Sequence, residues 1–75
     1  MKTATLLIYQ PHQTQHVCVQ LSYRRNYLID FLGHPSELLE LTEKAVAFAV
    51  NYKFDRLKVN GKVYKFSDFI QTLKG

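Results

Sequence analysis

The sequence is poor in the residues that mark secreted, membrane and collagen-like proteins. It has one cysteine, three glycines, two prolines and no tryptophan among 75 residues. A single cysteine excludes an internal disulfide, on which small secreted domains commonly depend, so we expect an intracellular, cytoplasmic protein. The longest apolar run, residues 45–50, is far below the ~18 residues of a membrane span. The apolar run near the N-terminus is also too short for an export signal. We therefore expect neither membrane insertion nor export.

Motifs for catalysis or cofactor binding are also lacking. The three glycines form no phosphate-binding loop. Three acidic residues fall on the solvent side of an expected helix, with no cleft beside them: Glu37, Glu40 and Glu43. We expect that the protein is not an enzyme and uses no cofactor. A nuclease that combines a histidine with the basic C-terminal region is a minor alternative.

A metal site finds little support in the histidine and cysteine pattern. His16 and Cys18 lie two residues apart on one face of an expected strand, and His12 or His34 could add a ligand if the turns converge. This spacing is not the paired spacing of structural zinc sites. A reactive thiol needs a lowered pKa, and no residue near Cys18 in the sequence is of a kind that clearly lowers it. We expect no metal ligands in this chain.

What the sequence does contain is enough apolar material for one small core. Apolar residues make up 47% of the chain, an ordinary globular value. Because a domain needs roughly 50 residues or more, we expect residues 1–75 to form a single domain. A domain of this size buries only about 60% of the surface that its unfolded chain exposes, so self-association would add stability.

The first half of the chain predicts strands. Residues 3–9 are rich in β-branched and apolar residues and end before Pro11, which lacks a backbone donor. Strict alternation over residues 16–23 predicts a second strand, with Val17, Val19, Leu21 and Tyr23 on its inner face.

Residues 23–33 fit either a helix that ends at Gly33 or a third strand. A three-residue loop, Arg24-Arg25-Asn26, would pair Tyr23 with Tyr27 across a hairpin. The same register pairs Leu21 with Ile29 and Val19 with Phe31, so that apolar residues meet throughout. We favour the hairpin for this reason. It would turn both tyrosines inward and leave Leu28 and Leu32 on the outer face.

The second half predicts a helix, a hairpin and a short helix. Apolar residues at spacings of three and four predict a long helix over about 35–52, with Pro35 in its first turn and Ser36 as its cap. Asn60-Gly61 predicts a two-residue hairpin turn, and Ser67-Asp68 predicts the cap of a final helix. The order β-β-β-α-β-β-α indicates a small two-layer α+β domain. Its four or five mainly antiparallel strands would pack on one long helix.

The net charge of +4 lies entirely in the last third of the chain. Residues 1–50 carry as many acidic as basic side chains, whereas residues 51–75 carry six basic and two acidic ones. In the expected hairpin, Arg56, Lys58 and Lys65 share one face, and Lys62 lies at the turn on the other. Arg56 opposite Lys65 is a like-charge pair, which destabilises a sheet unless an anion lies between the two.

These features give two functional hypotheses. The first is a small non-enzymatic binding module that contacts an anionic partner, DNA or RNA above all, through the basic side chains Arg56, Lys58, Lys62 and Lys65, assisted by Arg24 and Arg25. The second is a protein-interaction or regulatory subunit, either a homodimer or an adaptor or inhibitor of a larger protein. It would pair an exposed strand edge, such as residues 3–9, with a partner and extend the contact through Leu28 and Leu32.

Overall fold

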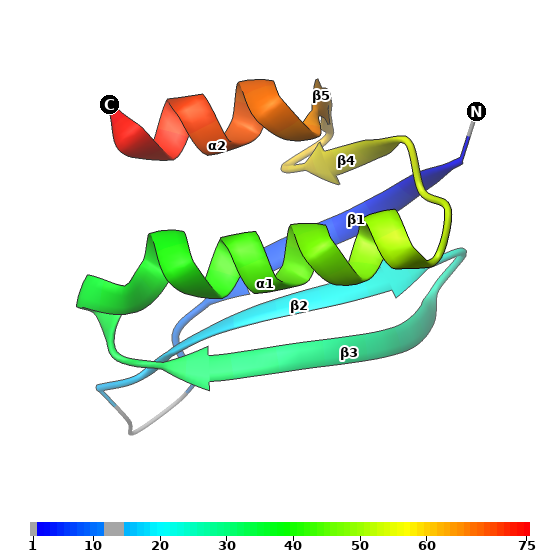
Figure 1. The fold of residues 1–75 in the computed structure, drawn as a ribbon. Helices are drawn as coiled ribbons and strands as arrows, with labels where there is room; N and C mark the ends of the chain where they lie inside the picture. The colour runs from blue at the N-terminus through cyan, green and yellow to red at the C-terminus, as the bar shows by residue number, and fades with distance from the viewer. Residues whose placement is uncertain (1, 12–14) are drawn as a thin grey trace.

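The computed structural model describes residues 2–11 and 15–75 and has the α+β architecture that the sequence predicts (Figure 1). The order of elements along the chain is β-β-β-α-β-β-α, as expected. In sequence order they are β1 (Thr3–Tyr9), β2 (Val17–Tyr23), β3 (Asn26–Gly33), a 3₁₀ turn (Pro35–Glu37), α1 (Leu38–Asn51), β4 (Arg56–Val59), β5 (Lys62–Lys65) and α2 (Phe66–Lys74).

The five strands form one mixed sheet in the order β3-β2-β1-β4-β5. Neighbouring strands are antiparallel except β1 and β4, which are parallel because α1 carries the chain across the sheet between them. The expectation that residues 3–9 offer an exposed edge is therefore wrong. This strand is apolar enough for the middle of the sheet and is paired on both sides, so the edges are β3 and β5.

The β2–β3 hairpin confirms the strand interpretation of residues 23–33 but not its loop. The turn has two residues, Arg24 and Arg25, and both have positive φ (51° and 68°), as a type I′ turn requires. Tyr23 pairs with Asn26, and a bulge at Leu28 then restores the expected pairing of Leu21 with Ile29. The three-residue loop is thus wrong.

The bulge changes which side chains face outward. Since Ser22 pairs with Tyr27, the ring of Tyr27 lies on the opposite face of the sheet from Tyr23 and is 60% exposed. Leu28, expected on the outer face, is half-buried and packs against the core. Leu32 does face outward, at 62% exposure.

The helix caps differ from those expected. A proline keeps the preceding residue extended, so His34 rather than Ser36 is the N-cap of the 3₁₀ turn that leads into α1. The His34 Nδ1 accepts a hydrogen bond from the Ser36 amide at 3.3 Å, and the Glu37 carboxylate accepts one from the His34 amide at 2.8 Å. In α2 the N-cap is Lys65 without a side-chain bond, and Ser67 and Asp68 lie inside the first turn.

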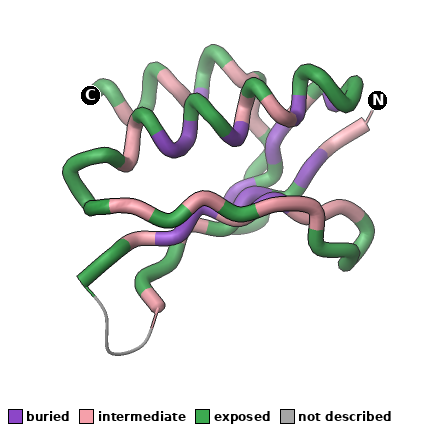
Figure 2. Tube along the Cα trace, turned by 60° about the horizontal axis from the view of Figure 1, so that its bottom comes forward, coloured by how far each residue is buried: buried purple, intermediate pink, exposed green. Residues whose placement is uncertain are grey.

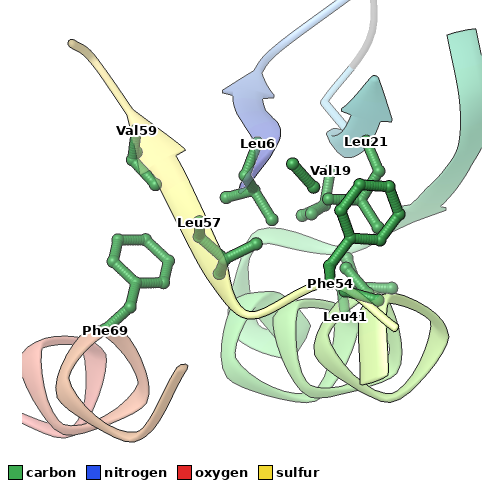
Figure 3. Close-up of a cluster of buried hydrophobic side chains, with 11 residues drawn as sticks. Leu6, Val19, Leu21, Leu41, Phe54, Leu57, Val59 and Phe69 are labelled. Atoms are coloured by element: carbon green, nitrogen blue, oxygen red, sulfur yellow. The ribbon is translucent and has the colours of Figure 1, made fainter. Parts of the chain in front are cut away.

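Both helices cover the same face of the sheet, and the core lies between the two layers (Figure 2). Figure 3 shows strand side chains directed toward α1, and Phe69 of α2 directed toward β4. Each fully buried leucine there contributes about 1.5–3 kcal/mol relative to an exposed one. The buried cluster consists of Ala4, Leu6, Val19, Leu21, Leu41, Ala45, Ala49, Phe54, Leu57, Val59 and Phe69.

One polar side chain in this core has no partner. Thr42 of α1 is fully buried, and its hydroxyl has no hydrogen-bond partner among the described residues. We expect Thr42→Val, which keeps the shape and removes the hydroxyl, to raise the free energy of unfolding by about 1 kcal/mol. Urea denaturation followed by circular dichroism measures the change.

The matched control is Thr72→Val on the exposed side of α2. The Thr72 hydroxyl donates to the Asp68 carbonyl at 3.0 Å, and its replacement should change the stability by less than about 0.5 kcal/mol. A destabilised Thr42→Val protein would contradict the prediction, because it would show that the hydroxyl is satisfied.

Candidate functional site

The face of the sheet away from the helices is covered by no described helix or strand (Figure 2). We call it the open face. Strand alternation and register bring to it residues from all five strands: Thr3, Thr5, Leu7, Tyr9, Cys18, Gln20, Ser22, Tyr27, Asp30, Leu32, Arg56, Lys58, Val63 and Lys65. Seven large apolar side chains of the described residues are exposed, and five of them lie here: Leu7, Tyr9, Tyr27, Leu32 and Val63.

Three of the expected site residues come together on the open face. Arg56 pairs directly with Lys65, and Lys58 follows on the same face of β4, opposite Val63. We call Arg56, Lys58 and Lys65 the basic strip. The Arg56 guanidinium donates to the Asp55 carbonyl at 3.0 Å, and no carboxylate of the described residues forms an ion pair with the strip. The three positive charges of the basic strip therefore have no ion-pair partner in the described part of the chain.

Lys62 lies on the other face of the hairpin. It pairs with Val59, whose side chain is buried beneath the helices, and its ammonium lies 5.2 Å from the centroid of the Tyr64 ring. The Tyr64 ring in turn packs edge-on against Phe69 of α2. The structure therefore does not bring Lys62 together with the basic strip, and its charge lies on the helix side.

Arg24 and Arg25 lie at the end of the sheet where β4 begins with Arg56, as the pairing of Thr5 with Ser22 and of Thr3 with Arg56 shows. The Arg24 guanidinium is 5.1 Å from the Tyr23 ring, which packs edge-on against Phe54 on the helix side. Arg24 is thus directed to the helix side and the structure does not bring it together with the basic strip, whereas Arg25 lies next to it in the exposed turn.

Two tyrosines of the open face lie away from the basic strip, Tyr9 at the far end of the central strand β1 and Tyr27 on the edge strand β3. Tyr9, 38% exposed, pairs in register with Cys18, which points to the open face yet is only 3% exposed. Tyr27 lies at the β3 edge near Asp30, the only acidic residue on this face among the described residues. The edge opposite the basic strip thus carries an aromatic ring and one negative charge.

Both phenols are held in their neutral form. A hydrogen bond with Cys18 is the main cause that raises the pKa of Tyr9 above 10.0, followed by the electrostatic effect of Cys18, partial burial and the charge of Asp30. Partial burial is the main cause that raises the pKa of Tyr27, followed by the charge of Asp30 and a hydrogen bond to its carboxylate. At pH 7 the rings carry no charge that would repel an anion.

The sequence missed Tyr9 and Tyr27 as site residues for a geometric reason. The three-residue loop put Tyr27 inward, and only the two-residue turn with its bulge turns the ring outward. Two signals could have found them. In β1 the side chains of Ile8 and Tyr9 point to opposite faces of the sheet, so a partly buried Ile8 implies an outward Tyr9. A turn made of Arg24 and Arg25 alone has the two-residue length that is most frequent in hairpins.

The histidine and cysteine side chains considered as metal ligands are not gathered in the described part of the chain. Within residues 2–11 and 15–75 no three His, Cys, Asp or Glu side chains gather closely enough to hold a metal ion, and no cavity is found. His12 lies outside the described residues. The His34 ring caps the turn before α1, and Cys18 is buried.

Comparisons with protein families, curated proteins and solved structures find no match to this chain. The longest helix of the described residues, α1, has 14 residues and is too short to cross a bilayer. Any functional interpretation therefore depends on the chemistry of the open face.

The link between Asp30 and Tyr27 can be measured directly. We expect Asp30→Asn to lower the pKa of Tyr27 toward 10.0, because the negative charge and the charged acceptor are removed while the partial burial stays. A carbon-13 NMR titration of the tyrosine rings follows each phenol separately. An unchanged Tyr27 titration would show that Asp30 does not contact the phenol.

The raised values also set the sign of the alkaline stability. A group whose pKa is higher in the folded state contributes stability below its unfolded pKa and loses it as the pH rises through the folded pKa. The wild-type protein should therefore lose stability above pH 10 more steeply than the Asp30→Asn variant.

Proposed function

We propose that this protein is a small non-enzymatic module that binds nucleic acid through the basic strip. The observation that carries the proposal is the gathering of three cations on an uncovered face, with no carboxylate of the described residues paired to them. Phosphate groups are the anions that closely spaced lysine and arginine side chains commonly hold.

The spacing of the basic strip suits a phosphodiester backbone. Directly opposed residues of an antiparallel pair are about 4.5–5.5 Å apart, so Arg56 and Lys65 repel each other when no anion is present. A phosphate between the two would replace this repulsion with two charge-assisted hydrogen bonds. Lys58 lies two residues along β4, roughly 6.6 Å away, and could hold the next phosphate.

Salt dependence tests the proposal. With three cations neutralising single-strand phosphates, the slope of log K against log salt concentration should be about −2. Lys58→Glu combined with Lys65→Glu should abolish binding of a fluorescein-labelled oligonucleotide, measured by anisotropy at low salt.

The matched control makes the same change of net charge elsewhere. Lys44→Glu combined with Lys74→Glu reverses two exposed lysines on the helices, away from the open face. This variant should keep most of the affinity. Equal losses in both double variants, or no binding by the wild-type protein at low salt, would refute the proposal.

Protein interaction is the second candidate, and the apolar half of the open face favours it. Leu32 is 62% exposed at the β3 edge, and Asp30 is the only charged residue of that eight-residue strand. Such an edge has little protection against pairing with another chain. If the face is a protein interface, light scattering should show a mass that rises with concentration, and Leu32→Asp should restore the monomer. A monomer at all concentrations contradicts a homodimer.

A further inference from the structure

We infer that the nucleic acid is single-stranded and that it stacks a base on Tyr27; this inference rests on the proposed function. The first support is the register across the sheet. Lys58, Thr5, Ser22 and Tyr27 stand in one row, which crosses β4, β1, β2 and β3 in that order. With strands about 4.8 Å apart, the row spans roughly 14 Å from the backbone of Lys58 to the backbone of Tyr27.

The side chains between the two ends of the row are small. Thr5 and Ser22 are the only residues between Lys58 and Tyr27, and both have small side chains with a hydroxyl group. The flexible stem of Lys58 shortens the remaining gap. A nucleotide held by its phosphate at Lys58 thus has an open path toward the aromatic ring, with hydroxyl donors and acceptors beneath it.

The ring of Tyr27 is accessible for stacking. It is 60% exposed and stands on the same face of the sheet as the basic strip, so a base can reach it without displacing a described helix or strand. Tyr9 offers a second, less exposed ring two residues beyond Leu7 on the same face.

The distribution of charge favours a single strand over a duplex. The basic strip lies on β4 and β5 at one side of the open face, and Asp30 lies on β3 at the other. A single strand has the same asymmetry, with charged phosphates along one edge and neutral bases along the other. A duplex lying across the face would bring phosphates close to Asp30, and its base faces would be hidden from Tyr27.

The experiment compares two ligands and three variants. A labelled oligothymidylate of about 12 nucleotides and a duplex of the same length are titrated by anisotropy at the same low salt concentration. We expect the wild-type protein to bind the single strand at least about fivefold more tightly. Tyr27→Leu should weaken single-strand binding by about fivefold or more, because it keeps apolar bulk but removes the ring.

Two variants control for the loss of the hydroxyl and for the loss of any exposed ring. Tyr27→Phe keeps the ring and should stay within about twofold of the wild type. Tyr52→Leu removes a ring that is 57% exposed but stacks on Phe48 at 4.3 Å at the end of α1, and it should leave the affinity unchanged. Circular dichroism checks that each variant is folded.

The outcomes separate this inference from the proposed function. Equal affinity for duplex and single strand, or equal affinity of Tyr27→Leu and Tyr27→Phe, overturns the inference; the proposed function then stands if the Lys58 and Lys65 double variant still loses binding. No binding of either ligand overturns both. A dimer in light scattering that Leu32→Asp dissociates, together with no binding of either ligand, would make the open face a protein interface instead.

Discussion

The parallel pairing of β1 with β4 joins the two halves of the protein, and the rest of the arrangement depends on it. Ala4 pairs with Leu57, and both side chains are fully buried against the helices. Lys2 strengthens this junction: its amide donates to the Asp55 carboxylate at 3.0 Å, and its carbonyl accepts from the Asp55 amide at 2.7 Å. The Lys2 ammonium also donates to the Tyr52 carbonyl at the end of α1, at 3.3 Å. These contacts place the neutral N-terminal strands and the basic C-terminal hairpin in one sheet.

The sequence predicts best those features that are decided within a few residues. Asn60 and Gly61 have φ values of 52° and 81°, as their turn requires, and all four pairs of the β4–β5 hairpin have the predicted register. The shared face of Arg56, Lys58 and Lys65 follows from that turn alone, because side chains alternate strictly on both strands. The long helix is predicted for a similar reason, since its apolar spacing repeats over several turns.

Features that depend on distant residues or on the balance between two similar turns are predicted less well. The sequence of residues 3–9 contains no signal for pairing with β4, which is about 50 residues away. This central strand was therefore expected to be an edge. Arg24 and Arg25 are unusual in a turn that needs positive φ at both positions, and a loop ending at Asn26 is the conformation that propensity favours. The structure instead has a two-residue turn and a bulge, which packs Leu28 partly against the core and keeps Ile29 opposite Leu21.

The size of the domain explains why one face of the sheet stays open. Helices of 14 and nine residues cover one side of five strands, and no other helix of the described residues is available for the second side. Exposed apolar residues are ordinary on protein surfaces and carry no functional meaning alone. Here five of them share a face with three cations that no described carboxylate pairs, while the one carboxylate among the described residues of that face, Asp30, lies on the far strand near Tyr27. A surface that only had to remain soluble would mix charges of both signs. The separation of cations from rings across the open face therefore gives it a direction, from β5 to β3, along which a ligand with one charged and one aromatic edge would be oriented.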